Sequence, residues 1–131
     1  MPEPALALRL LAFDYGTRRI GVAAGNSLTG TAEPHATVAS VEAAAALVRE
    51  WQPDALVVGV PFHPDGAAHE NTARARRFAR QLAGRCRLPV HEVDERYTTT
   101  EALAQGARGE QADAAAAAII LQQYLRSLEA A

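Results

Sequence analysis

Residues 8–25 read LRLLAFDYGTRRIGVAAG, and the other predicted elements are arranged around this segment. An apolar run ends in Asp14, a short turn follows at 15–17, and a second apolar run occupies 20–24. Two apolar runs joined by a short glycine-containing turn are typical of a β-hairpin. Asp14 therefore lies where a buried strand emerges, and a carboxylate there is costly unless a cation meets it. It is either an ordinary turn acid or a metal ligand that needs partner acids elsewhere in the chain.

Composition indicates a globular protein with a proper core. The chain has 131 residues, of which 49% are hydrophobic and 21% charged, with a formal net charge of −2. This length predicts a single domain spanning 1–131. One cysteine, Cys86, excludes an internal disulfide and suits a reducing compartment. We see neither a signal peptide nor an apolar run of the ~18 residues that a membrane span needs, so we expect a cytoplasmic protein without membrane contact.

The remaining pattern predicts an α/β fold. We expect strands at 6–14, 18–25, 33–38, 54–60 and 88–93, and helices at 40–51, 71–84, 101–105 and 112–128. The run DALVVGV at 54–60 is apolar throughout, as in central parallel strands. Three strands followed by alternating helices and strands predict a mixed five-stranded sheet flanked by helices. The loop at 61–68 follows the end of a central strand, where α/β proteins place ligands, so His63 is a candidate substrate contact.

Acidic residues recur where predicted elements meet the interior. Asp94 and Glu95 end what the pattern indicates is a second central strand, and Asp113 opens the last helix. At 3.6 residues per turn, Asp113 shares an apolar face with residues of the same helix: Ala117, Ile120, Tyr124 and Leu128. Asp113 either complements the helix dipole or points at the sheet. Because adjacent strand residues face opposite sides, only one of Asp94 and Glu95 should enter a shared site.

Converging carboxylates predict a metal-dependent reaction. Carboxylates that meet at one spot repel one another, so some are protonated or a cation binds them. With no convincing His or Cys cluster, hard oxygen ligands suit Mg²⁺ or Mn²⁺. Two such ions about 3.5–4 Å apart can activate a water and stabilise the leaving oxygen of a phosphodiester. Hydrolysis of a nucleic-acid strand is therefore the expected chemistry.

At this point the sequence resembles the YqgF/RuvX family over about residues 8–125. The resemblance is carried by FDYGTRRIGVA (13–23), VVGVPFHPDG (57–66), the run 78–82, VDERYTT (93–99) and DAAAAAIILQQYL (113–125). It implies a ribonuclease H-like fold, similar to Holliday junction resolvases, and a nuclease role in maturing the 5′ end of bacterial 16S ribosomal RNA, hence in ribosome biogenesis. It also implies that Asp14, Glu95 and Asp113 are the catalytic and metal-binding residues, with Asp94 a secondary candidate.

Arginines near these acids are candidate substrate contacts. Arg18 and Arg19 follow the hairpin turn and either contact phosphate or form a solvated turn. Arg96 adjoins the acids and either orients Glu95 or contacts phosphate. Four arginines spread around the helix predicted at 71–84, which favours a solvated face. The four histidines are scattered without metal-ligand spacing.

Three other functions use the same features. A Holliday junction resolvase would apply the same acids to branched DNA and usually acts as a dimer, so monomer and homodimer both stay open. A non-catalytic RNA-binding module would keep the fold, although the intact acid set argues against it. Residues 14–17 also resemble the first phosphate loop of sugar kinases and actin-like ATPases, which need two such domains.

Overall fold

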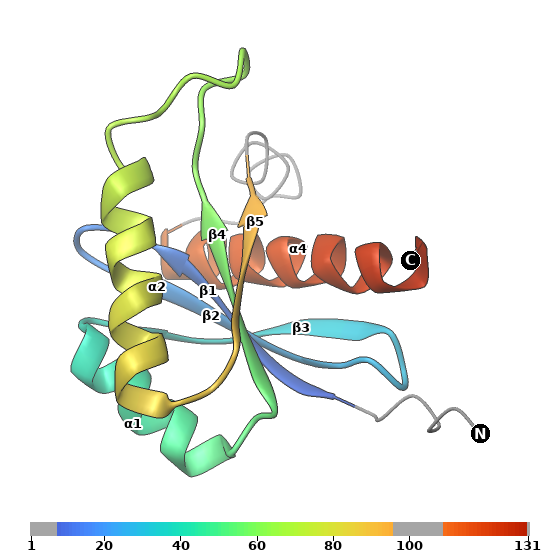
Figure 1. Ribbon diagram of the computed structural model, residues 1–131. Coiled ribbons are helices and arrows are strands. Elements are labelled where there is room, and N and C mark those ends of the chain that lie inside the picture. Colours follow the sequence, from blue (N-terminus) through green and yellow to red (C-terminus); the bar gives the residue numbers. More distant parts are fainter. Residues whose placement is uncertain (1–7, 96–108, 131) are drawn as a thin grey trace.

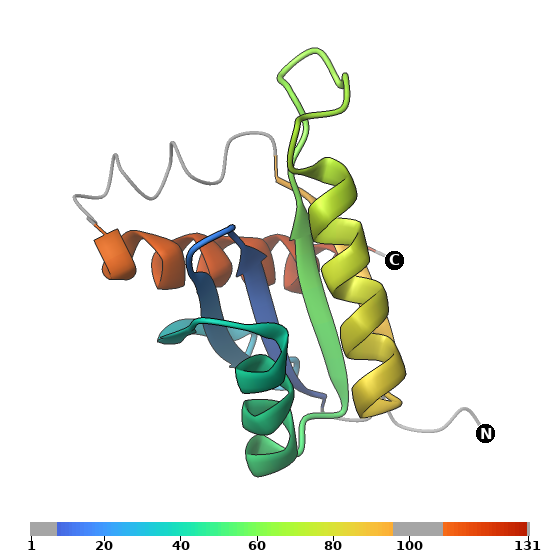
Figure 2. The same ribbon diagram turned by 90° about the vertical axis from the view of Figure 1, so that its left-hand side faces the viewer.

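The computed structural model describes residues 8–95 and 109–130, which form a five-stranded sheet with helices on both faces (Figures 1 and 2). The strands are β1 (Arg9–Tyr15), β2 (Ile20–Asn26), β3 (Thr31–Val38), β4 (Ala55–Val60) and β5 (Val90–Asp94). The helices are α1 (Val41–Trp51), α2 (Thr72–Cys86) and α4 (Gly109–Ala130). The predicted fold class is confirmed, and predicted boundaries differ by up to three residues. The helix predicted at 101–105 lies outside the described residues.

The sheet has the order β3-β2-β1-β4-β5, with β1 at its centre. Strand β1 pairs antiparallel with β2 and parallel with β4, which pairs parallel with β5. Strand β4 is buried along its whole length, as its apolar sequence predicts. The prediction that Asp94 and Glu95 end a central strand is wrong, because β5 is an edge strand. Its polar His91 and Glu92 are exposed, as an edge position allows.

The two faces of the sheet carry separate cores. Helices α1 and α2 cover one face, and α4 crosses the other (Figures 1 and 2). Phe13 and Phe78 lie in the first core and pack edge to face, with ring centroids 5.7 Å apart. The second core contains mostly smaller residues, among them Ala12, Ala23 and Ala117. This second face is the one that bears Asp14, because Asp14 has the same parity along β1 as Ala12.

Local signals explain the ends of the elements. Ser40 caps α1 as its sequence position suggests, with its Oγ accepting a hydrogen bond from the Ala43 N–H at 3.1 Å.

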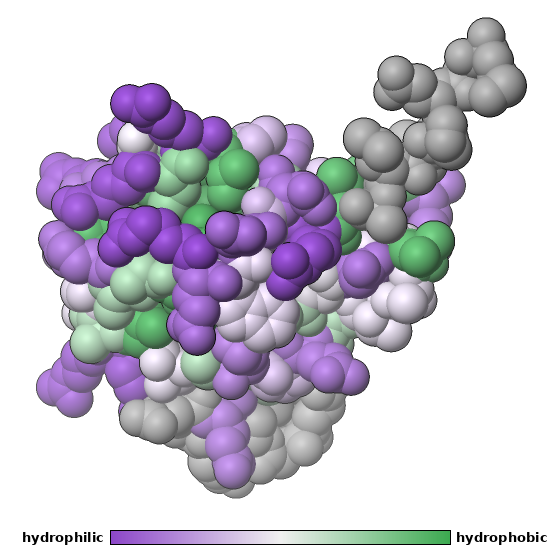
Figure 3. All heavy atoms as spheres, turned by 90° about the horizontal axis from the view of Figure 1, so that it is seen from below, coloured by the Kyte–Doolittle hydropathy of each residue, from purple (hydrophilic) through white to green (hydrophobic). Residues whose placement is uncertain are grey.

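Between β4 and α2, residues 61–70 rise beyond the ends of the strands in both views (Figures 1 and 2). The opposite end of the molecule is mainly hydrophilic and shows only separate small hydrophobic areas (Figure 3). In the described part of the chain, no helix is long and apolar enough to cross a membrane.

Candidate active site

Asp14 lies near the end of the central strand, between two glycines. In the sheet register it stands opposite Gly21 on β2 and opposite Gly59 on β4. A Cβ added at Gly21 would collide with the backbone carbonyl oxygen of Asp113. A Cβ added at Gly59 would collide with Ile120 and lie 3.0 Å from Cδ of Glu95. The two glycines therefore leave the space beside Asp14 that the other two acids occupy.

Glu95 is held against Asp14 by the backbone. It directly follows β5, and its N–H donates a hydrogen bond to the Val60 carbonyl oxygen at 3.1 Å. The Glu95 residue is only 8% exposed, and its carboxyl group is hydrogen-bonded to that of Asp14. Its Oε2 is buried and has no hydrogen-bond partner in the part of the chain that the structure describes. The carboxyl groups of Asp14 and Glu95 are therefore in contact, and Glu95 Oε2 remains able to accept a further bond.

Asp113 approaches the pair from α4. Because α4 begins at Gly109, Asp113 lies one turn inside the helix and not in its predicted first turn. Its Oδ2 lies 2.7 Å from Nε of Arg19, an ion pair whose geometry makes no hydrogen bond to that buried oxygen. Of the face that it was predicted to share, Ala117 and Ile120 are fully buried. Leu128, at the far end of the same apolar face, is 38% exposed.

Burial and the charges of neighbouring acids raise the pKa of both contacting acids. For Asp14, burial is the largest cause and brings the pKa from 3.8 to about 6, with the Asp113 charge adding to the rise. For Glu95, burial again dominates, followed by the charge of Asp14, and together they raise the pKa from 4.5 to about 10. Two carboxyl groups in contact share a proton in this way unless a cation replaces it.

The donor atoms at this site suit a hard divalent cation. Carboxylate oxygens are the ligands that Mg²⁺ and Mn²⁺ prefer. Glu95 Oε2 and Asp113 Oδ2 are buried oxygens that accept no hydrogen bond from residues 8–95 or 109–130. Within 8–95 and 109–130, no three His, Cys, Asp or Glu side chains already form a group able to hold a metal. Asp113 is near enough for its charge to raise the pKa of Asp14, while its Oδ2 is paired with Arg19 at 2.7 Å. The metal and catalytic roles of these acids stay predictions.

The other predicted residues have different surroundings. Arg18 is exposed beside the hairpin turn, while Arg19 pairs with Asp113, a partner that the sequence did not indicate. Asp94 is exposed at the end of β5, and its charge contributes to the raised pKa of Glu95. Arg96 lies outside the described residues. The four arginines of α2 at 74, 76, 77 and 80 are exposed, as predicted.

The histidines are less scattered than the sequence suggested. The rings of His63 and His69 contact each other with centroids 5.0 Å apart, although six residues separate them. The two glycines beside Asp14 were also missed as site residues. Their signal was available, because each interrupts an apolar strand, and a glycine there indicates close backbone approach.

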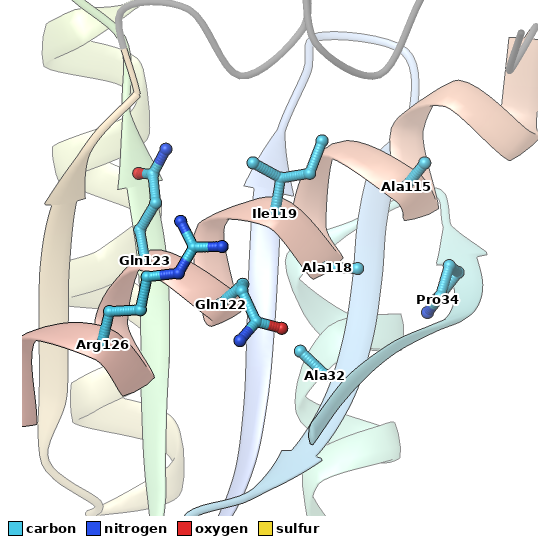
Figure 4. A pocket seen from close by; sticks show the side chains of 8 residues that line it. All are labelled: Ala32, Pro34, Ala115, Ala118, Ile119, Gln122, Gln123 and Arg126. Carbon is cyan, nitrogen blue, oxygen red and sulfur yellow. The ribbon is translucent and has the colours of Figure 1, made fainter. Parts of the chain in front are cut away.

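A groove of about 360 Å³ lies apart from the acids, between α4 and the edge strand β3 (Figure 4). Its walls come from Ala32, Pro34, Ala115, Ala118, Ile119, Gln122, Gln123 and Arg126. None of the candidate acids lines it, so the groove is separate from the site at Asp14.

Comparison with known proteins identifies close relatives. The family model described as "RuvX: Holliday junction resolvase" matches residues 8–127. A protein of Albidiferax ferrireducens named "Putative pre-16S rRNA nuclease" is 66% identical over 123 residues, which cover 90% of this chain and 78% of that protein. A protein of the same name from Polaromonas sp. is 63% identical over 123 residues, with 90% and 88% covered.

Solved structures agree on the fold. Thermus thermophilus RuvC in complex with a Holliday junction substrate superposes with a TM-score of 0.58 at 16% identity, covering 92% of this chain and 95% of RuvC. Archaeoglobus fulgidus Pelota gives 0.53 at 10% identity, covering 96% of this chain and 36% of Pelota. At such identities the likeness concerns the fold alone, which is the ribonuclease H-like fold predicted from the sequence.

Proposed function

Since this chain belongs to the RuvX family, we propose that it is a divalent-metal-dependent nuclease that processes the 5′ end of the 16S ribosomal RNA precursor. Nuclease activity follows from the family and from relatives that are 66% and 63% identical and carry the name pre-16S rRNA nuclease. The observation that supports the metal-dependent chemistry is the contact between Asp14 and Glu95, where Glu95 Oε2 is buried with no hydrogen-bond partner among the described residues. Buried acids in contact are a typical sign of a catalytic centre.

Each residue of the site has a proposed role. Asp14 and Glu95, joined by Asp113, would hold the cation, which supplies an activated water and neutralises charge on the leaving oxygen. Before the cation binds, Asp14 and Glu95 share a proton, and Arg19 neutralises Asp113 at 2.7 Å. The exposed Arg18 lies on the same turn as Arg19 and would contact a backbone phosphate.

Cleavage of precursor RNA tests this proposal. An RNA that carries the 5′ precursor segment of 16S ribosomal RNA is incubated with the protein and Mg²⁺ or Mn²⁺. We expect cutting by the parent and a loss of at least about 100-fold with Asp14→Asn or Glu95→Gln, more than a supporting residue would cost. Glu42→Gln is the matched control, since Glu42 is exposed on α1 and paired with Arg85. Equal cutting by the parent and both acid variants refutes the assignment.

The family description favours one alternative substrate. Because the matching family model is described as a Holliday junction resolvase, the same acids could cut branched DNA as part of a dimer. A synthetic four-way junction, tested beside the RNA and with sizing of the protein, separates the two. Symmetric cutting of the junction in preference to RNA would reassign the substrate and leave the role of the acids in place. We place the protein in the cytoplasm, acting on ribosomal precursors.

A further inference from the structure

Residues 61–70, here called the finger, form an ordered projection and not a loose loop. Phe62 and Ala68 pair as an isolated bridge, and the His63 N–H donates to the Ala67 carbonyl oxygen at 2.9 Å. At the tip, the Gly66 N–H donates to the His63 carbonyl oxygen at 2.8 Å, and its φ of 91° favours glycine. The finger is therefore a small hairpin closed by its own backbone.

The base of the finger is fastened by a buried threonine. The hydroxyl of Thr72, which is 4% exposed, donates to the Pro61 carbonyl oxygen and accepts from the His69 N–H at 2.7 Å. Both ends of the finger are thus tied to the first residue of α2. None of these hydrogen bonds uses the side chain of His63, so a substitution of that side chain leaves their donors and acceptors in place.

The finger starts at the candidate active site. Val60, the residue before it, accepts the hydrogen bond from the N–H of Glu95 at 3.1 Å. From there the finger rises past the ends of the strands (Figures 1 and 2). A strand whose phosphodiester reaches Asp14 and Glu95 would therefore have its neighbouring nucleotides beside the finger.

The finger carries two histidine rings and a phenylalanine ring, and an arginine side chain of α2 lies at its base. His63 is exposed and contacts the ring of His69 at a 45° tilt, and the N–H of Asn71 fixes His69 by donating to its Nδ1 at 3.0 Å. At the base, the guanidinium of Arg76 lies 5.4 Å from the centre of the Phe62 ring. Such aromatic and guanidinium surfaces stack on nucleobases whose faces are exposed. Paired bases hide these faces inside the duplex.

We propose that the finger binds unpaired nucleotides next to the cleaved bond, with His63 stacking on a base. This inference rests on the proposed nuclease function and adds a preference for an unpaired strand. At the base of the finger, the guanidinium of Arg76 lies over the Phe62 ring and is paired with Glu92, with Nε 3.3 Å from Oε1. His63 is a specificity residue here and takes no part in the chemical step.

Binding in a cleavage-impaired background tests the finger directly. In the Glu95→Gln protein, fluorescence anisotropy follows a labelled unpaired RNA of about 16 nucleotides, the same sequence as DNA, and the RNA annealed to its complement. We expect His63→Ala to weaken binding of the unpaired strands by about 5- to 50-fold, with little change for the duplex. His63→Phe should restore binding, because a phenyl ring also stacks.

Two controls separate stacking from damage to the fold. His35 is another exposed histidine, on the opposite edge strand β3, and its ring lies 4.6 Å from the ring of Trp51 between centroids. His35→Ala should leave binding of the RNA unchanged. In the cutting-competent protein, His63→Ala should raise KM more than it lowers kcat. Binding of unpaired RNA within about 2-fold of the parent, an equal loss on duplex, or no rescue by His63→Phe overturns the inference. Cutting by Glu95→Gln at the parent rate would refute the proposed function and leave the binding result to stand.

Discussion

The two faces of the sheet differ in their side chains, since buried aromatic rings lie under α1 and α2, whereas alanine and glycine lie around Asp14 under α4. Under α1 and α2, the fully buried residues include large and aromatic side chains: Leu11, Phe13, Val22, Leu56, Val58, Phe78 and Leu82. Under α4, the described part of the core combines leucine and isoleucine with four alanines and has no buried aromatic ring, and the two residues opposite Asp14 in the neighbouring strands are Gly21 and Gly59. Large side chains fill the space under α1 and α2, whereas glycine at position 21 allows the backbone of α4 to lie close to β2.

The difference shows how a helix can deliver an acid to a strand. A carboxylate on a short aspartate side chain reaches only a few ångströms, so Asp113 can act with Asp14 only if α4 lies close to β2. Gly21 permits this approach, because a Cβ there would occupy the position of the Asp113 carbonyl oxygen. The face with large side chains should accordingly govern stability, and the face with small ones should govern the geometry of the site.

The largest expected effect on stability lies on the face with large side chains. Phe78 packs on Phe13 at 5.7 Å and on Tyr15 at 5.3 Å between ring centroids. We expect Phe78→Ala to lower the free energy of unfolding by about 3–5 kcal/mol, measured by urea denaturation. Cleavage per folded molecule should persist in Phe78→Leu, the milder variant to use if the alanine variant does not fold. A fall in kcat of Phe78→Leu beyond about 10-fold would show that the two faces are not separable.

The next effect comes from the face with small side chains. Gly21→Ala places a methyl group against the backbone of α4, so we expect a loss of about 1–3 kcal/mol together with most of the cleavage. The matched control is Gly84→Ala in α2, where an added Cβ meets nothing within 4 Å. This control should stabilise the protein by about 0.5–1 kcal/mol, with unchanged cleavage. If Gly21→Ala kept full activity, close approach of α4 would not be needed for the site.

A smaller effect, of opposite sign, is expected from the shared proton. Because the folded pKa values of Asp14 and Glu95, about 6 and about 10, exceed their ordinary 3.8 and 4.5, the folded protein binds more protons than the unfolded chain. Stability of the metal-free protein therefore falls as pH rises from about 4 through 6, and continues to fall toward 10. In EDTA at pH 8, Glu95→Gln should have a free energy of unfolding about 1–2 kcal/mol higher than that of the parent, measured by urea denaturation.

The pH series contains its own test. The stability gain of Glu95→Gln should shrink as the pH falls, and vanish only below the unfolded pKa of 4.5, where the Glu95 carboxyl group is protonated in both states. Glu42→Gln, exposed on α1, should follow the parent at every pH. A gain that is constant with pH would mean that packing of the amide, and not removal of a titrating group, stabilises the variant.

Much of this arrangement could be predicted from the sequence, and the remainder could not for identifiable reasons. Asp14 was recognisable because it ends an apolar run, and the five-stranded fold follows from the order of runs. The sequence did not predict that β5 lies at an edge of the sheet, because a short apolar run does not show whether a strand pairs on one side or on both. The contact between His63 and His69 depends on the turn of the finger, which brings residues six apart together.

The partner of Asp113 was equally hidden from the sequence. Arg19 and Asp113 are 94 positions apart, and their contact at 2.7 Å exists only because α4 crosses the hairpin. The sequence therefore predicted which acids belong to the site, but it did not predict the ion pair between Asp113 and Arg19. The carboxylate of Asp113 has two possible partners, the guanidinium of Arg19 and a cation held by Asp14 and Glu95.

The smallest effect on stability, and the sharpest test of which partner Asp113 binds, is Arg19→Gln. The Arg19 side chain is 47% exposed, so its ion pair should contribute less than about 1 kcal/mol to stability. If Asp113 joins Asp14 and Glu95 in holding a cation, Arg19 competes with that cation for the same carboxylate. Removing Arg19 should then tighten Mn²⁺ binding several-fold in calorimetry, whereas Arg18→Gln, one residue earlier and also exposed, should not. Weaker or unchanged Mn²⁺ binding would mean that Asp113 only anchors α4 to the hairpin, and the site would reduce to the two acids on the strands.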